Sequence, residues 1–257
     1  MKRCFLFSFI ISVFMLFAQD DTLFLPFDAT TLTDEQKNSN PDYLAYPLSL
    51  ASQVPDINCN QSTDCMEAVD LGLSVKWATC NVGASSPEDY GDYFAWGETE
   101  LKTTYDLSTY KHCKGTSRTM TKYCDNSSYG NNGFTDNKTV LDPADDAAIV
   151  NWGGSWRMPT YVEFNELMEQ CAWIWTTQNG VNGYKVVGPN GNSIFLPAAG
   201  HMEDYGLETV GSNGTYWSSS FNTKFPDCNS RVYFVSNDVY WGLSSRGYGL
   251  SVRPVCK

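Results

Sequence analysis

The chain has 257 residues, with 29 acidic side chains against 17 basic ones and a formal net charge of −12. An acidic surface of this kind repels phosphate backbones, so nucleic acid is not expected as a partner. Aromatic residues make up 14% of the chain, among them 8 tryptophans and 15 tyrosines, so the sequence is typical of a globular domain with a large aromatic content.

The N-terminus has the layout of a secretory signal peptide. Lys2 and Arg3 precede a run of apolar residues over 4–17, and Ala18 is followed at once by polar residues. The apolar run is shorter than the roughly 20 residues that a membrane-spanning helix needs. We therefore predict a signal peptide over residues 1–18 and export through the Sec pathway to the cell surface or the medium. The alternative is a retained N-terminal anchor, since Leu16 stands where a small residue is preferred at a cleavage site.

Residues 19–66 are rich in Asp, Thr, Asn, Ser and Pro and have few periodic apolar positions. This composition is typical of a polar lead-in or linker, which a Cys59–Cys65 bridge could close. The character changes after residue 66, so we place one globular domain over 67–257. Within it, apolar and polar residues alternate over 69–77, which predicts a strand with one buried face.

Two helices are expected. Thr160 is a candidate N-cap, and Glu163 three residues later completes a capping box. The apolar positions Phe164, Leu167, Met168 and Cys171 then fall on one helix face. Residues 142–150 predict a second, shorter helix with Asp142 as its cap and Pro143 at its first position.

The rest of the domain is expected to be β-structure. Strands are predicted over 173–177, 184–187, 193–196, 231–235, 239–243 and 250–255. The first two could be joined by a turn at either Asn179-Gly180 or Asn182-Gly183, and residues 188–191 predict another turn. The expected class is α+β with a dominant antiparallel sheet.

Five blocks of the sequence resemble the Fibrobacter succinogenes major paralogous domain family. They are VDLGLSVKWATCNVGASSPEDYGDYFAWGETE (69–100), NWGGSWRMPTYVEFNELMEQC (151–171), NGYKVVGPNGNSIFLPAAG (182–200), YWSSS (216–220) and SVRPVC (251–256). The resemblance implies a C-type-lectin-like fold, with a twisted antiparallel sheet, one or two flanking helices and long loops. It also implies an exported or surface protein of Bacteroidetes type, and no settled activity. The WRMPT segment further resembles formylglycine-generating enzymes and the variable proteins of diversity-generating retroelements, so fold alone does not decide function.

Eight cysteines remain after Cys4, an even number that in an exported chain indicates disulfides whose pairing sequence alone leaves open. We predict Cys80, Cys113, Cys171 and Cys256 as core disulfide partners. The resemblance to C-type-lectin-like domains makes Cys171–Cys256 the favoured pair, because it would join the end of a helix to the last strand. There is no CxxC motif, and no metal or other cofactor is expected.

Catalytic patterns are weak throughout. His112 and His201 are the only histidines, and neither adjoins a nucleophile motif, so we interpret both as loop residues. Glu163, Glu166 and Glu169 are more typical of a solvated helix face than of a glycosidase pair. A formylglycine-type cysteine pair would have to use Cys228 and Cys256, whose surroundings do not match that enzyme's motif. Partial calcium-loop spacing at Asp125, Ser127, Gly130 and Asp136 is interpreted as turn chemistry, because Tyr129 occupies a ligand position.

The strongest remaining signal is a group of aromatic and basic residues in a Ser-, Gly- and Asn-rich context near the C-terminus, a composition typical of adaptable binding loops. The predicted ligand-binding residues are Tyr205, Lys224, Tyr240, Trp241, Arg246 and Tyr248. We therefore expect a non-catalytic binding module for a protein or a glycan. The alternatives are a structural or adhesive component of a surface assembly, a formylglycine-generating-type enzyme, and loops whose aromatic residues are incidental.

Overall fold

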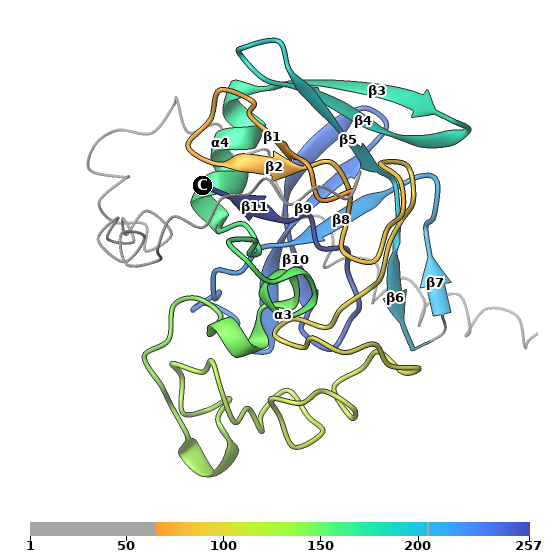
Figure 1. Ribbon diagram of the computed structural model, residues 1–257. Helices are drawn as coiled ribbons and strands as arrows, with labels where there is room; N and C mark the ends of the chain where they lie inside the picture. Colours follow the sequence, from red (N-terminus) through yellow and green to blue (C-terminus); the bar gives the residue numbers. More distant parts are fainter. Residues whose placement is uncertain (1–64, 205) are drawn as a thin grey trace, which may run out of the picture. The chain divides into compact units, whose positions relative to one another are not determined.

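The computed structural model describes residues 65–204 and 206–257, so the predicted signal peptide and residues 19–64 of the predicted lead-in lie outside the described residues. The described part is α+β, with few helices and several small antiparallel sheets (Figure 1). The expected α+β class is confirmed. The prediction of a single dominant sheet is wrong, because the strands of the described residues form one two-stranded sheet and three three-stranded sheets.

The sheets are built from local hairpins and from the two ends of the domain. One joins β1 (Ala68–Val69), β2 (Lys76–Ala78) and β11 (Val255–Cys256). The second joins β3 (Ala172–Gln178), β4 (Val181–Val187) and β5 (Ser193–Pro197). β6 (His201–Glu203) pairs with β7 (Gly206–Glu208), and β9 (Cys228–Val235) lies between β8 (Gly214–Trp217) and β10 (Asp238–Ser245).

The hairpin of β3 and β4 follows the prediction closely. Asn179 and Gly180 have φ values of 48° and 86°, and they form the turn between the two strands. Positive φ at both central residues is what a two-residue hairpin turn requires, and Asn-Gly tolerates it best. The alternative turn at Asn182-Gly183 is thereby excluded, because both residues pair within β4.

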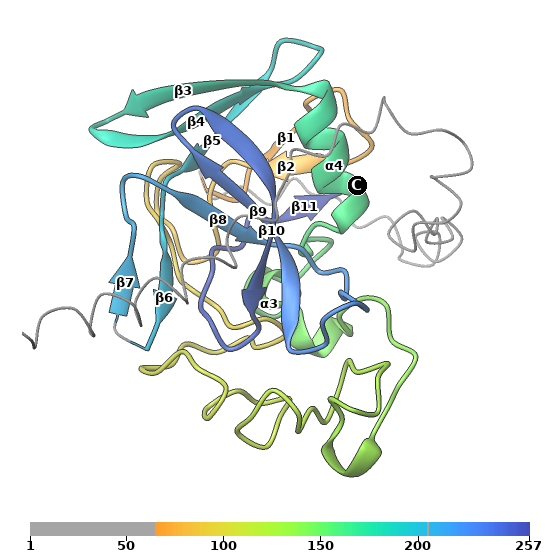
Figure 2. The same ribbon diagram turned by 180° about the vertical axis from the view of Figure 1, so that it is seen from behind.

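The main helix, α4 (Tyr161–Gln170), begins as predicted. The Thr160 hydroxyl accepts from the Glu163 N–H, and the Glu163 carboxylate accepts from the Thr160 N–H at 2.8 Å, so the capping box is confirmed. Phe164 and Leu167 are buried beneath the helix. Figure 2 shows α4 beside the β11 and β2 strands.

The second helix is displaced from its predicted start. Residues 143–145 form a short 3₁₀ helix, η5 (Pro143–Asp145), whose N-cap Asp142 makes no side-chain capping bond. The helix proper is α3 (Ala147–Trp152), and its cap is Asp146, whose carboxylate accepts from the N–H groups of Ala148 and Ile149. Asp146 also accepts from the Met158 N–H, so it joins the helix start to the chain beyond the helix.

The predicted strand over 69–77 is interrupted. Its ends form β1 and β2, while the middle turns, because the Gly72 N–H bonds the Asp70 carboxylate at 2.7 Å and Gly72 has a φ of +80°. The alternating residues Leu71, Val75 and Trp77 are nevertheless buried. The pattern therefore identified the side chains that face the core, although Val69 and Leu73 are only half-buried and most of the backbone is not a strand.

The core lies in two main clusters. In the first, Trp77 packs on Phe164 of α4 with ring centroids 5.1 Å apart, above the inner face of β8 and β9. In the second, Trp96 and the β8 residue Trp217 pack with residues of α3 and of several loops, and each indole N–H donates to a backbone carbonyl at 2.8 Å. Trp156 is also buried, and Trp152 beside it is half-buried.

Residues 98–145, drawn in yellow to green in Figure 1, form long loops that converge on one buried carboxylate. Asp145 accepts hydrogen bonds from Lys111 Nζ at 2.9 Å, Lys122 Nζ at 2.5 Å and the Tyr123 hydroxyl at 2.8 Å. The side chain of Asp145 is only 4% exposed. Its three donors all come from the loop segment 111–123, so this one residue fixes that segment to η5.

The predicted disulfides need correction. Cys80 is bonded to Cys65, which excludes a Cys59–Cys65 bridge and joins the end of the predicted lead-in to the domain. Cys113 and Cys171 are free thiols, whereas Cys256 is disulfide-bonded, so the favoured Cys171–Cys256 pair is wrong. The physical reason is placement: β11, which carries Cys256, pairs with β2 at Lys76, while Cys171 ends α4 and leads directly into β3.

Burial keeps the free thiols unreactive. Desolvation raises the pKa of Cys113 and Cys124, and it raises the pKa of Cys171 and Cys228 to about 11. A thiol with so high a pKa is almost wholly protonated near neutral pH and is a poor nucleophile. Within the described ranges, no helix is both long and apolar enough to cross a membrane.

Candidate functional site

The structure does not bring the predicted ligand-binding residues together. Tyr205 lies outside the described residues. Lys224 is exposed in the loop before β9, with its ammonium 5.6 Å from the Phe225 ring. Tyr240 pairs with Tyr233, five residues beyond the start of β9, which at about 3.3 Å per residue is roughly 17 Å away along the strand. Lys224 and Tyr240 therefore lie toward opposite ends of this hairpin.

Arg246 was predicted to be a ligand donor, and this is wrong because the side chain is fully buried. Its guanidinium lies 4.7 Å from the Trp96 ring and 4.8 Å from the Phe221 ring. It donates to the Tyr123 carbonyl at 2.8 Å. Planar guanidinium groups stack well on aromatic faces, so Arg246 is part of the core that holds the long loops.

Tyr248 is half-buried and packs against the second core cluster. Its ring lies 6.2 Å from His201 of β6, and burial raises the pKa of its hydroxyl to about 12. Its contacts are therefore mainly internal, which differs from the free loop position expected from sequence.

Tyr240 and Trp241 are neighbours in β10 whose side chains point to opposite faces. Trp241 stacks on Tyr161 with centroids 4.1 Å apart, and its indole N–H donates to the Asn165 side chain at 3.3 Å. Trp241 therefore covers α4 and belongs to the fold. Tyr240 instead packs on Tyr233, its direct partner across the strands, with centroids 4.9 Å apart.

The outer face of β9 and β10 is the best candidate site in the described part of the chain. We call Arg231, Tyr233, Tyr240 and Asn213 the tyrosine face. The Arg231 guanidinium lies 4.5 Å from the Tyr233 ring and donates to the Leu243 carbonyl at 3.3 Å. Asn213 donates to the Tyr233 hydroxyl at 2.6 Å. All four side chains are half-buried, and neither tyrosine belongs to a core cluster.

The chemistry of this face includes one phenol whose ionisation is suppressed. Desolvation, reinforced by Tyr233, raises the pKa of Tyr240 to about 12, so its hydroxyl stays protonated and can both donate and accept hydrogen bonds. The single cation, Arg231, is already occupied by a carbonyl and a ring. The face can therefore offer flat apolar surface together with hydroxyl and amide groups.

Tyr233 and Arg231 were missed as site residues, although the sequence held a signal. Within the predicted strand 231–235, Val232 and Phe234 alternate with Arg231 and Tyr233. Since Val232 and Phe234 are apolar and prove to be fully buried, strand periodicity places the other two on the opposite face. The register that puts Tyr240 opposite Tyr233 depends on the turn at 236–237, which sequence did not fix.

The residues considered for catalysis are distributed through the fold. His112 lies in a turn, as predicted, but it is buried, with Nε2 2.9 Å from the Gly97 carbonyl oxygen, and desolvation lowers its pKa. His201 was predicted to be a loop residue, and this is wrong because it begins strand β6; desolvation lowers its pKa as well. Cys228 is a free thiol and Cys256 is disulfide-bonded, so these two do not form a dithiol pair.

The acidic residues considered for metal binding or catalysis are engaged locally. Asp136 accepts from the backbone N–H groups of Tyr123 and Cys124. The predicted solvated face of three glutamates is wrong for two of them: Glu163 is in the capping box and bonds Arg157, and Glu166 accepts from the Ser74 N–H. Of the three, Glu169 alone is exposed. Over residues 65–204 and 206–257, no group of three His, Cys, Asp or Glu side chains is placed to hold a metal ion.

Comparison with known proteins found no matching family model, no matching curated protein and no matching solved structure.

Proposed function

We propose that this protein is an exported binding module that contacts a protein or a glycan through the tyrosine face. The proposal combines the signal-peptide layout of residues 1–18 and the resemblance to the Fibrobacter succinogenes major paralogous domain family with the geometry of β9 and β10. A C-type-lectin-like arrangement of the small sheets and two helices belongs to the same proposal. It rests on the resemblance and is compatible with the α+β class.

One observation carries the proposal. Tyr233 and Tyr240 pair across two strands on the face turned away from the core, while Val232 and Trp241 in the same strands serve the core. Tyrosine adds contact area at a low entropic cost because it has only two side-chain torsions. A pair fixed on adjacent strands, with Arg231 stacked beside it, loses still less freedom when a ligand binds.

The charges on the protein restrict the class of ligand that the tyrosine face can bind. The net charge of −12 disfavours polyanions such as nucleic acid. The cation on the tyrosine face is engaged with Tyr233 and the Leu243 carbonyl, so an anionic ligand gains little there. A neutral glycan can stack its apolar ring face on a phenol and bond its hydroxyls to phenol and amide groups. A protein surface with exposed aromatic or amide groups can use the same contacts.

The test is a binding screen of the mature protein against glycan and protein arrays, repeated with Tyr233→Ala and Tyr240→Ala. We expect at least one ligand whose binding both substitutions weaken about tenfold or more, since truncating a hot-spot aromatic typically costs about 2 kcal/mol or more and a tenfold change needs only about 1.4 kcal/mol. A ligand bound equally well by both variants would place the binding surface elsewhere. Regular self-assembly of the purified protein, with no ligand found, would favour the structural or adhesive alternative instead.

A further inference from the structure

β3 is an edge strand with none of the usual protection against pairing. It lies at one side of the β3–β4–β5 sheet and at the rim of the described part in both Figure 1 and Figure 2. Its seven residues, Ala172–Gln178, include no charged residue and no proline, and its register with β4 runs without a bulge. Charges, prolines and bulges are the devices by which natural edge strands avoid pairing with other chains. β3 can therefore accept a further strand.

The backbone groups of β3 that point outward follow from the register. The Ala198 N–H donates to the Asn182 carbonyl at 2.8 Å, so the backbone groups of Asn182 point toward β5 and away from β3. Thr177 is the register partner of Asn182, so its own N–H and C=O point outward, and those of Trp175 and Trp173 do the same by the two-residue repeat. Among the described residues, no backbone hydrogen bond outside the β3–β4 ladder engages these groups. Three donors and three acceptors are thus exposed along one edge.

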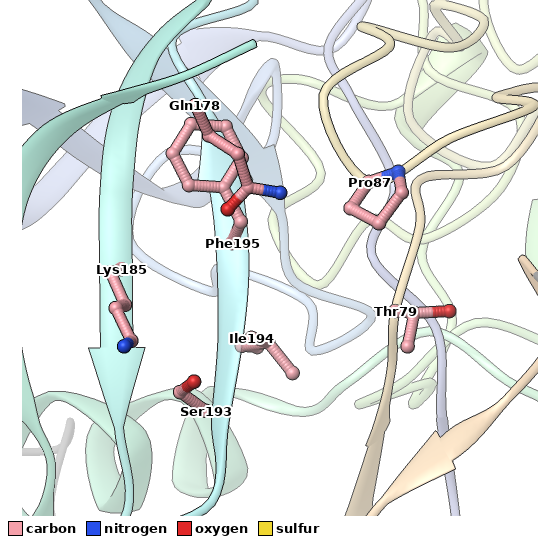
Figure 3. A pocket seen from close by; sticks show the side chains of 7 residues that line it. All are labelled: Thr79, Pro87, Gln178, Lys185, Ser193, Ile194 and Phe195. Atoms are coloured by element: carbon pink, nitrogen blue, oxygen red, sulfur yellow. The ribbon is translucent and has the colours of Figure 1, made fainter.

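The other outer strand of this sheet, β5, is already covered. The segment carrying Thr79 and Pro87 faces β5 across a small pocket (Figure 3). The Phe195 carbonyl, on the outer side of β5, accepts from the buried Arg253 guanidinium at 2.9 Å. The sheet can therefore be extended at β3 but not at β5.

The edge strand of the other long hairpin, β10, is protected as well. It begins with the charged Asp238. Near its middle, Trp241 stacks on Tyr161 of α4 with ring centroids 4.1 Å apart. Further along, the Leu243 carbonyl accepts from Arg231 at 3.3 Å. Of the strands longer than five residues in the described part of the chain, β3 alone has an open edge.

β3 also leaves apolar side chains incompletely covered. Trp173 and Trp175 pack on Tyr184 with ring centroids 5.4 and 5.2 Å apart, yet both are only half-buried. On the opposite face, Ile174 is 51% exposed. A strand paired with β3 would cover part of these side chains. Because β3 has no charged residue, two copies of it can be paired without placing like charges opposite each other.

We propose that β3 pairs antiparallel with β3 of a second copy of this chain and joins the two three-stranded sheets into one. The outward-pointing residues are symmetric about Trp175, so a two-fold axis beside it sets Trp175 opposite its own copy and Trp173 opposite Thr177. Each of these pairs can exchange two backbone hydrogen bonds. On the other face, the same register sets Ile174 opposite Thr176, and β-branched side chains suit neighbouring strands.

Such a contact uses the same surface of both copies, so it closes at two chains. It therefore differs from the open-ended self-assembly that would favour a structural or adhesive component. It shares no residue with the tyrosine face, so the dimer and the proposed function can fail independently. Each copy contributes one strand, which is less than the roughly 20–30 residues a side of a standard interface. We therefore expect a weak dimer with a Kd of about 50 µM.

Sedimentation equilibrium of the full mature protein, from about 5 to 500 µM in physiological salt, tests the proposal. The weight-average mass should rise with concentration from that of one chain toward that of two. A mass of one chain over the whole range overturns the proposal, even where an added peptide binds β3. A mass that rises beyond two chains overturns the closed contact.

A charge placed on β3 tests whether this strand forms the contact. Ile174→Lys adds the kind of residue that protects natural edge strands, and it should weaken the dimer at least about tenfold, because the register brings the two lysines close together on one face. The control is Val150→Lys on α3, since Val150 is also β-branched and 51% exposed, and it should leave dimerisation unchanged. Equal weakening by both variants, or by neither, contradicts the assignment of β3.

A second pair of variants tests the backbone hydrogen bonds. Thr177→Pro removes an outward N–H that the fold does not use, and it should weaken the dimer about tenfold or more, because each copy loses one donor. Thr177→Ala keeps the N–H and, like Thr177→Pro, loses the hydroxyl that bonds Asn182, so it should stay within about threefold of the wild type. Similar melting temperatures of the two variants separate loss of pairing from loss of folding. Wild-type dimerisation of Thr177→Pro overturns the proposal.

Discussion

Replacing Arg253 by Met should destabilise the protein by about 4 kcal/mol. The guanidinium is fully buried and donates to the side chain of Asn81 at 2.9 Å and to the carbonyls of Ala78, Thr79 and Phe195 at 3.0, 2.5 and 2.9 Å. It thereby joins the chain after β2 to β5 from a position just before β11. No carboxylate is among these acceptors, so the buried charge is held by dipoles alone.

The magnitude follows from two opposing contributions. Each hydrogen bond from a charged donor contributes about 1.5–3 kcal/mol, so four contribute roughly 6–12 kcal/mol, and methionine would leave the acceptors unpaired. Against this, desolvation lowers the pKa of Arg253 to about 10, which corresponds to a cost of about 3 kcal/mol that methionine would not incur. Subtracting this cost from the hydrogen-bond contribution leaves a predicted loss of roughly 3–9 kcal/mol in the free energy of unfolding. We take about 4 kcal/mol, from the lower part of this range. It is a large share of a typical stability of about 5–15 kcal/mol.

The assay is urea unfolding followed by tryptophan fluorescence, with thermal melting alongside. Arg253→Met should lower the melting temperature by roughly 8–16 °C. The control is Arg118→Met, an exposed arginine that should change stability by less than about 0.5 kcal/mol. Arg253→Lys should lie between Arg253→Met and the wild type, because lysine keeps the charge but lacks the planar fork. A loss below about 1 kcal/mol for Arg253→Met would refute the reasoning.

Three further predictions concern the helix, the loops and export. Thr160→Ala should cost about 1 kcal/mol of stability in the same urea assay, since it removes the capping acceptor, and an unchanged midpoint would contradict the capping box. Burial opposes ionisation of Asp145, but hydrogen bonds from its lysine and tyrosine neighbours prevail and lower its pKa to about 2. Its contribution of about 2 kcal/mol should therefore be present above pH ~4 and disappear as pH falls toward 2; Asp145→Asn should flatten this dependence, while the exposed control Asp204→Asn should not. Mass spectrometry of the exported protein should find its N-terminus near Gln19, and an intact Met1 in a cytoplasmic fraction would contradict export.

Sequence patterns predicted those parts of the fold that local chemistry decides. The capping box at Thr160, the Asn179-Gly180 turn and the hairpin around it depend on residues a few positions apart, and all three are present. The start of the shorter helix was misplaced because Asp142 was predicted to be its cap, whereas Asp142 precedes only the 3₁₀ turn. In the structure Asp146 is the N-cap of α3, and its carboxylate also accepts a hydrogen bond from the distant Met158 N–H.

The candidate site could be predicted only in part, because burial of polar residues depends on contacts between distant segments. From its sequence context Arg246 was predicted to lie at the surface, yet its guanidinium packs against the rings of Trp96 and Phe221. The prediction of the disulfide pairs failed for the same reason, since Cys80 is bonded to Cys65 and not to a cysteine at a helix end. Tyr240 was predicted as a site residue from its Ser- and Gly-rich context, and it stays a prediction. Its partner Tyr233 requires the strand register, which only the folded hairpin provides.

The most direct test of the central claim compares two adjacent aromatic residues of β10. Tyr240→Ala removes a ring from the tyrosine face, whereas Trp241→Ala removes a ring that packs on Tyr161 and Phe164 of α4. For a ligand found in the array screen, Tyr240→Ala should weaken binding about tenfold with little change in melting temperature. Trp241→Ala should lower the melting temperature clearly and leave the affinity of the folded protein unchanged. The opposite pattern, with binding lost only in Trp241→Ala, would contradict the assignment of the tyrosine face.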